Sequence, residues 1–144
     1  MKPSREQSTK PDAKKSLGTS WKSLIAEDVR AETGGKVSVI GLYADDKVTI
    51  QMPASAPDPS PAQPILIEGV CILTTAFNLP TRTLFEMSLS NPSGAVVATG
   101  SMHIEAGEVN HSISKFRPLP ITELGMWRLE FKSASLLHEY SFCI

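Results

Sequence analysis

Short apolar segments recur along most of the chain and are separated, about every ten residues, by Gly, Pro, Asn and Asp. Strict alternation of apolar and polar residues is frequent in these segments, whereas the spacing of an amphipathic helix is scarce. Short strands at this spacing are typical of sandwiches and barrels. We therefore predict an all-β protein, an antiparallel immunoglobulin-like β-sandwich.

The first predicted strand covers residues 21–32, whose apolar positions also fit a helix. A strand is preferred because Thr33, Gly34 and Gly35 supply a hairpin turn into a clear strand at residues 36–43. That second segment, KVSVIGLY, carries apolar residues at both alternating sets of positions. The pattern predicts that part of it is buried on both faces of the sheet.

The middle of the chain combines a turn, a proline-rich loop and the most apolar segment. Asp45 and Asp46 predict a turn into a short strand at residues 47–52. Residues 53–64 contain five prolines, which cannot join a hydrogen-bonded ladder, so we predict a loop that crosses between the sheets. Residues 65–77 predict a strand at the centre of a sheet, with Gly69 marking a bulge or a close approach.

The C-terminal half shows the clearest alternation. Trp127, Leu129 and Phe131 alternate with charged residues, which predicts a strand with one buried face. The last strand places His138, Tyr140, Phe142 and Ile144 on a single face. The remaining predicted features are a strand at 82–90, a type I turn at 91–94, strands at 95–99 and 109–116, and a corner at 118–120.

Three of these segments resemble an uncharacterised family of small bacterial and phage-encoded β-sandwich proteins. They are GGKVSVIGLY at Gly34–Tyr43, the hairpin LFEMSLSNPSGAVVATG and the closing pattern ELGMWRLEF…LHEYSFCI. The resemblance covers most of residues 23–144 and rests on patterning. It implies a sandwich fold and a bacterial or phage origin, and it carries no catalytic residues over to this chain. The basic N-terminal segment and the proline-rich loop depart from that pattern and leave open a partner specific to this protein.

The N-terminal residues 1–20 differ from the rest in composition. They are polar, contain two prolines and hold five basic and two acidic residues, a net charge of +3. Such a segment cannot bury enough apolar surface to offset the entropy of ordering it. We predict a disordered basic tail over residues 1–20, either an electrostatic tether or a solvated terminus, and one β-sandwich domain over residues 21–144.

Charge and hydropathy exclude several classes of function. The net charge of −1 and the pI of about 6.3 provide no basic field for nucleic acid, and the short basic runs near Lys115 and Arg128 fit solvated sheet faces. No apolar run approaches the roughly 20 residues of a membrane-spanning helix, and no secretory signal is recognisable. We expect a cytoplasmic protein that binds neither nucleic acid nor membrane.

Candidate catalytic residues are scattered. Cys71 and Cys143 lie in predicted strands without metal or redox spacing, so the sequence predicts reduced core residues, with a disulfide or a nucleophile as the alternatives. His103 and His111 could meet across a hairpin near Glu105 or Glu108, a weak basis for a metal-dependent hydrolase. Phosphate-binding glycine motifs and a nucleophile elbow are absent from the sequence, which predicts no cofactor.

The leading hypothesis is a noncatalytic domain that binds a protein partner or assembles with itself. It follows from the sandwich pattern, whose edges must be covered or paired, and from the scarcity of catalytic motifs. The proposed contact is the rigid proline-rich loop, and its candidate residues are Pro57, Asp58, Pro59 and Pro61. Binding of a small ligand or a carbohydrate is an alternative, which exposed aromatic residues on one sheet would favour.

Overall fold

The computed structural model describes residues 18–144, which form ten strands in antiparallel sheets and no α-helix. The prediction of an all-β protein with antiparallel sheets is confirmed. Residues 1–17 of the predicted tail lie outside the described part of the chain. The strands are β1 (Ser20–Ala31), β2 (Val37–Leu42), β3 (Ile65–Ile67), β4 (Val70–Leu79), β5 (Thr83–Ser90), β6 (Val96–Ile104), β7 (Gly107–Phe116), β8 (Leu119–Ile121), β9 (Met126–Lys132) and β10 (Leu137–Cys143).

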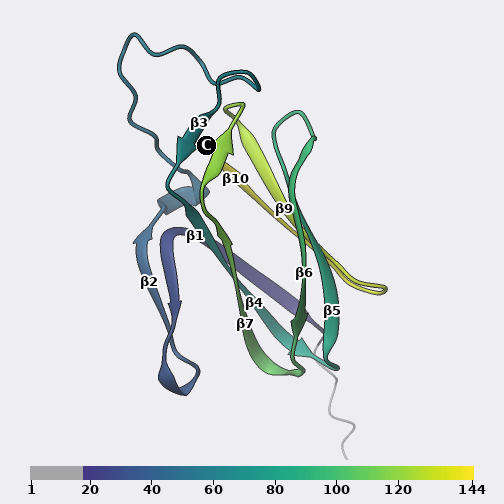
Figure 1. Ribbon diagram of the computed structural model, residues 1–144. Helices are drawn as coiled ribbons and strands as arrows, with labels where there is room; N and C mark the ends of the chain where they lie inside the picture. The colour runs from purple at the N-terminus through teal and green to yellow at the C-terminus, as the bar shows by residue number, and fades with distance from the viewer. Residues whose placement is uncertain (1–17) are drawn as a thin grey trace, which may run out of the picture.

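The strands form two four-stranded sheets that face each other, and a small third sheet. Sheet A has the order β2-β1-β4-β7, sheet B has the order β10-β9-β5-β6, and β3 pairs with β8 (Figure 1). The main core lies between sheets A and B. Its largest fully buried side chains are Trp127, Phe85, Phe131 and Phe142. The alternation predicted for β9 and β10 is confirmed, because Trp127, Leu129 and Phe131 of β9 and Tyr140 and Phe142 of β10 are buried in this core.

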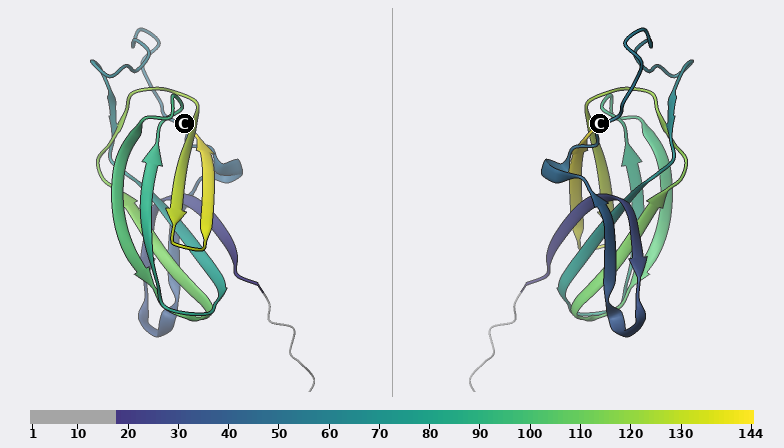
Figure 2. Two further views of the ribbon diagram at one scale, coloured as in Figure 1. Left: turned by 90° about the vertical axis from the view of Figure 1, so that its right-hand side faces the viewer. Right: turned by 90° about the vertical axis from the view of Figure 1, so that its left-hand side faces the viewer.

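Strand β1 pairs with two different strands along its length. Residues Ser20–Ala26 pair with β4, and residues Ala26–Ala31 pair with β2. Figure 2 shows β1 rising, arching over and descending into the hairpin with β2. The descending arm packs against β4 and β7 and encloses a second apolar cluster, in which Ala26, Val29, Cys71 and Leu73 are buried and Ile113 is partly buried. The hairpin predicted around Thr33–Gly35 is confirmed, with η1 (Thr33–Gly35) as its turn.

A cluster of charges lies at the bend of β1. The Arg117 Nη2 donates to Asp28 Oδ1 at 2.7 Å and to the Glu27 carbonyl at 3.1 Å. Asp28 also accepts from Arg30 Nε at 2.8 Å and from Lys115 Nζ at 3.3 Å. These cations, with the Arg30 hydrogen bond first, hold the pKa of Asp28 well below its usual range. The end of β7 is thereby tied to the point where β1 changes partner.

The close approach predicted at Gly69 is confirmed. A Cβ atom there would overlap the Arg117 side chain, so only glycine lets the backbone pass. The single central strand predicted at 65–77 is wrong, because Glu68 and Gly69 interrupt it. Its first part, β3, leaves sheet A and pairs with β8, which replaces the corner predicted at 118–120.

The strand predicted at residues 47–52 is also wrong. η2 (Ala44–Asp46) forms the turn expected from Asp45 and Asp46, and both aspartates have positive φ. The chain then makes one parallel bridge, Lys47 to Cys143, and one hydrogen bond from the Val48 N–H to the Cys143 carbonyl at 2.8 Å. Residues 49–52 lack a strand partner among the described residues, and Pro53 removes the next backbone donor.

Candidate interaction surface

Four strands lie at the edges of the two main sheets: β2 and β7 in sheet A, and β6 and β10 in sheet B. Segments of the same chain cover β10, because Val48 bonds to Cys143 at one end and Trp21 of β1 stacks on His138 at the other. Strand β7 carries Glu108 and Lys115, which discourage pairing with another chain, whereas β6 carries His103 as its one titratable side chain. The sequence of β2, VSVIGL, contains neither a charge nor a proline.

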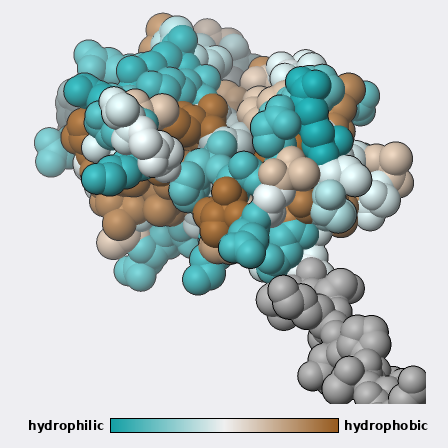
Figure 3. Space-filling view, turned by 90° about the horizontal axis from the view of Figure 1, so that it is seen from below, coloured by the Kyte–Doolittle hydropathy of each residue, from teal (hydrophilic) through white to brown (hydrophobic). Residues whose placement is uncertain are grey.

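Strand β2 exposes large apolar side chains. Val39 is 38%, Ile40 42% and Leu42 60% exposed. Figure 1 shows β2 at the margin of the molecule, and Figure 3 shows larger hydrophobic patches on the same side of the surface. The expectation that part of 36–43 is buried on both faces is wrong, because none of these residues is buried, and β2 pairs only with β1 within residues 18–144. An unpaired apolar edge of this kind is a template for another strand.

Opposite charges flank β2. Lys36 precedes the strand, and Asp45 and Asp46 follow it in η2. The Tyr140 hydroxyl donates to Asp46 Oδ1, and burial together with this bond raises the pKa of Tyr140 well above its usual range. Asp45 makes no ion pair within residues 18–144 and is exposed. The strand itself is therefore uncharged, with a cation at one end and a carboxylate at the other, and the Glu27 side chain of β1 lies over Gly41.

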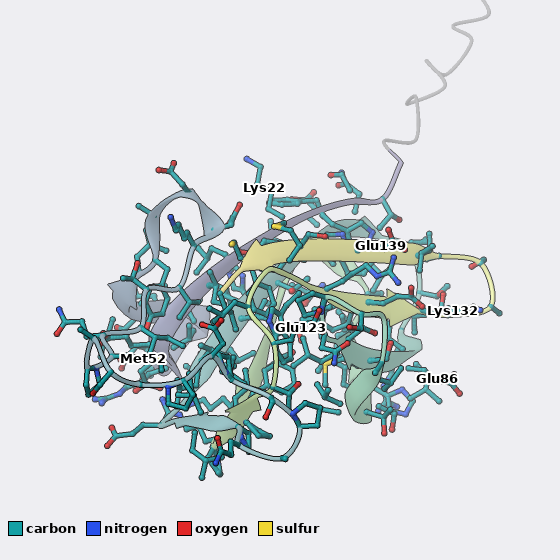
Figure 4. The ribbon with its side chains drawn as sticks, turned by 90° about the horizontal axis from the view of Figure 1, so that it is seen from above. Lys22, Met52, Glu86, Glu123, Lys132 and Glu139 are labelled. Carbon is teal, nitrogen blue, oxygen red and sulfur yellow. The ribbon has the colours of Figure 1, made fainter. Side chains whose placement is uncertain are left out.

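The proline-rich loop lies apart from any sheet ladder. Pro57, Asp58 and Pro61 are exposed, and Pro59 is partly buried. Short backbone turns shape the loop, from the Ala56 N–H to the Pro53 carbonyl at 2.9 Å and between Ser60 and Gln63. Figure 4 shows Met52, which precedes the loop, on the opposite side of the molecule from Glu86 and Lys132. The loop is accessible, and its proposed contact role stays a prediction.

A groove of about 550 Å³ lies beside the bend of β1. Its polar lining includes Glu27, Tyr43, Glu68 and Arg117, with Val48, Ile50 and Ile67 as apolar lining. Burial and the charge of Glu27 raise the pKa of Tyr43. The Arg117 guanidinium is already bound by Asp28 and the Glu27 carbonyl, so the groove presents mainly carboxylates and a phenol.

The predicted meeting of His103 and His111 does not occur. His103 lies on β6 of sheet B opposite Leu84, and His111 lies on β7 of sheet A with its Nδ1 2.9 Å from Thr75 Oγ1. Strands β6 and β7 follow each other in sequence but belong to different sheets, so the connection does not form the expected hairpin. Within residues 18–144, no three His, Cys, Asp or Glu side chains converge as a metal site would require.

A polar contact that the sequence analysis missed joins β1 to β10. The Nε2 atom of His138 lies 2.9 Å from Ser23 Oγ, which lies 2.9 Å from Thr74 Oγ1. The imidazole stacks on Trp21 with ring centroids 5.1 Å apart. Burial lowers the pKa of His138, with a smaller opposing contribution from Glu139. The contact closes the side of the sandwich between β1 and β10.

We expect stability to fall in mild acid because of His138. Its folded pKa lies below the value of 6.5 for the free group, so the unfolded chain takes up the proton first. The contribution of His138 to stability is constant above pH 6.5 and declines as the pH falls from 6.5 toward the folded pKa. Urea unfolding at about pH 7.5 and about pH 5 measures the decline.

The variant His138→Gln keeps a polar group toward Ser23 but does not titrate, so its decline should be smaller. His103→Gln removes an exposed histidine and serves as the control that retains the decline. An undiminished decline in His138→Gln would show that other groups are responsible.

The cysteines and aromatic residues bear on the remaining alternatives. Cys71 is buried and Cys143 partly buried, and they are not joined to each other. All nine aromatic residues lie in the described part of the chain and none is exposed, which does not favour a carbohydrate-binding face. The basic side chains of Lys115 and Arg117 both form ion pairs with Asp28. No described helix has the length and apolar character needed to cross a membrane.

Comparison with protein-family models and with curated proteins finds no match to this chain.

Proposed function

We propose that this chain is a noncatalytic protein-binding domain that receives an extended strand of a protein partner along β2. The observation that carries the proposal is the edge of β2, which is uncharged, apolar and exposed at Val39, Ile40 and Leu42. Of the other edges, β10 is covered by the same chain, β7 carries charged side chains, and β6 carries His103 and exposes only Val96 and Val97 as large apolar residues. Strand addition to such an edge takes affinity from backbone hydrogen bonds and specificity from alternate side chains.

The support given to β2 also suits binding. Through Val29 and Val37, the second apolar cluster holds the β1–β2 hairpin against β4 and β7. The ion pairs of Asp28 hold the bend of β1. A strand positioned in this way needs little ordering when a partner binds, which reduces the entropic cost of association.

We infer an immunoglobulin-like topology for the sandwich. The order β1-β4-β7 facing β10-β9-β5-β6 supports this, because it corresponds to strands A, B and E facing G, F, C and C′ of such domains. Trp21 contacts Phe85 edge to face across the core, with ring centroids 5.2 Å apart. The bacterial or phage setting rests on the resemblance in sequence alone.

The proline-rich loop is the second candidate contact. Exposure of Pro57, Asp58 and Pro61 supports it, since proline-rich segments lose little entropy on binding. We place β2 first because an unpaired apolar edge presents both backbone hydrogen-bonding groups and apolar side chains.

Selection of displayed random ten-residue peptides against the full chain tests the proposal. We expect enriched peptides with alternating apolar residues, whose binding slows hydrogen exchange in β2. Leu42→Lys places a charge on the edge and should weaken binding of these peptides about tenfold or more.

Leu137→Lys is the matched control, because Leu137 is also exposed, at 56%, but lies on β10. Its peptide affinity should equal that of the unmodified chain. Protection confined to residues 53–64 would assign binding to the loop instead, and failure to enrich any peptide would contradict binding at β2.

A further inference from the structure

We propose that the strand received by β2 is the β2 of a second copy, so that two chains form an antiparallel homodimer with one continuous sheet. This inference rests on the proposed function, because it names the partner of the same edge. Two features of β2 carry it: exposed apolar residues at Val39, Ile40 and Leu42, and charges of opposite sign at its two ends.

The apolar residues make the edge self-complementary. In a two-fold dimer, each surface patch meets its own copy, so a patch must match itself. Val39, Ile40 and Leu42 are exposed, and the successive residues Val39 and Ile40 lie on opposite faces of the strand. Antiparallel pairing of two such strands covers apolar side chains with apolar side chains on both faces of the extended sheet.

The flanking charges select the antiparallel orientation. Reversal of one strand against the other brings the Lys36 end of each copy beside the Asp45 end of its partner. Parallel pairing would instead place Lys36 beside Lys36 and Asp45 beside Asp45, which is repulsive. Lys36 and Asp45 are exposed and have no ion-pair partner among the described residues, so both are available.

The expected dimer is weak. A six-residue strand contributes much less buried area than the roughly 1,200–2,000 Å² of a stable interface. We therefore expect a concentration-dependent equilibrium between monomer and dimer rather than a permanent assembly.

Sedimentation equilibrium of the full chain over a concentration series tests the proposal. A reversible monomer–dimer equilibrium is expected. Lys36→Glu places two carboxylates together at each of two symmetric contacts and should raise the dissociation constant about tenfold or more. Adding Asp45→Asn to that variant should recover part of the loss, since asparagine also tolerates the positive φ of Asp45.

Lys22→Glu is the control with the same change in net charge. Lys22 lies on β1, where Figure 4 shows it pointing away from the sandwich, and its replacement should leave the dissociation constant unchanged. Circular dichroism checks that each variant is folded.

A chain that stays monomeric at every concentration would overturn the inference, as would a dimer that Lys36→Glu does not weaken. Peptide binding at β2 by a monomeric chain would leave the proposed function in place and remove only self-pairing. Loss of both peptide binding and dimer formation would remove both.

Discussion

Replacement of Trp127 by alanine is expected to lower the free energy of unfolding by about 3–5 kcal/mol. Trp127 is fully buried between the sheets, and its Nε1 donates to the Glu123 carbonyl at 3.2 Å. The change creates a large cavity and leaves that carbonyl without its side-chain donor. Urea unfolding followed by circular dichroism measures the loss.

Met126→Ala is the matched control. Met126 is next to Trp127 in sequence, but its side chain is 56% exposed and should contribute little to the free energy of unfolding. Trp127→Phe retains most of the apolar volume and should fold even where alanine does not. A loss for Trp127→Ala no larger than that of the control would show that Trp127 does not support the core as described.

Val29→Asp should release the β1–β2 hairpin from β4 and β7 and lower the free energy of unfolding by several kcal/mol. Val29 is fully buried in the second apolar cluster, where a carboxylate would lose its hydration among apolar side chains. We expect rapid hydrogen exchange in β2 and retained protection in β9, because the main core does not include Val29.

Val39→Asp provides the comparison, because Val39 is the cross-strand partner of Val29 but is 38% exposed. Measured at low protein concentration, its effect on stability should be small. Protection of β2 that survives in Val29→Asp would mean that pairing with β1 alone holds the hairpin.

The local pattern of apolar and polar residues predicted the strands correctly where one face of the strand contacts water. The alternation of Trp127, Leu129 and Phe131 predicted β9, and Asn91 to Gly94 predicted the turn between β5 and β6, where the Gly94 N–H donates to the Asn91 carbonyl at 2.9 Å. Both are consequences of contacts between near neighbours in sequence, which residue type controls directly.

The candidate site was missed for a related reason. KVSVIGLY carries the composition of a strand buried on both faces, but apolar residues read the same at an exposed edge. A buried strand and an exposed edge strand differ in their neighbouring strands. Those neighbours lie far apart in sequence, so the composition of the segment itself does not reveal them. The position of β2 became apparent only with the order of sheet A.

Long-range pairing also decided where the predicted strands ended. Residues 65–77 form one apolar run, yet Arg117 lies against Gly69 and the chain divides into β3 and β4 for different sheets. Residues 47–52 alternate like a strand but find only Cys143 as a partner. His103 and His111 are eight residues apart and still belong to different sheets.

The sequence by itself determined the all-β class, most of the strands and the inward faces of β9 and β10, because these depend on short-range alternation and turn chemistry. Only the tertiary structure decided that β1 bends between two partners, that Arg117 and Asp28 hold that bend, and that β2 is an edge strand of sheet A among residues 18–144. These features depend on pairings between residues tens of positions apart, whose free energy is gained only when distant segments meet.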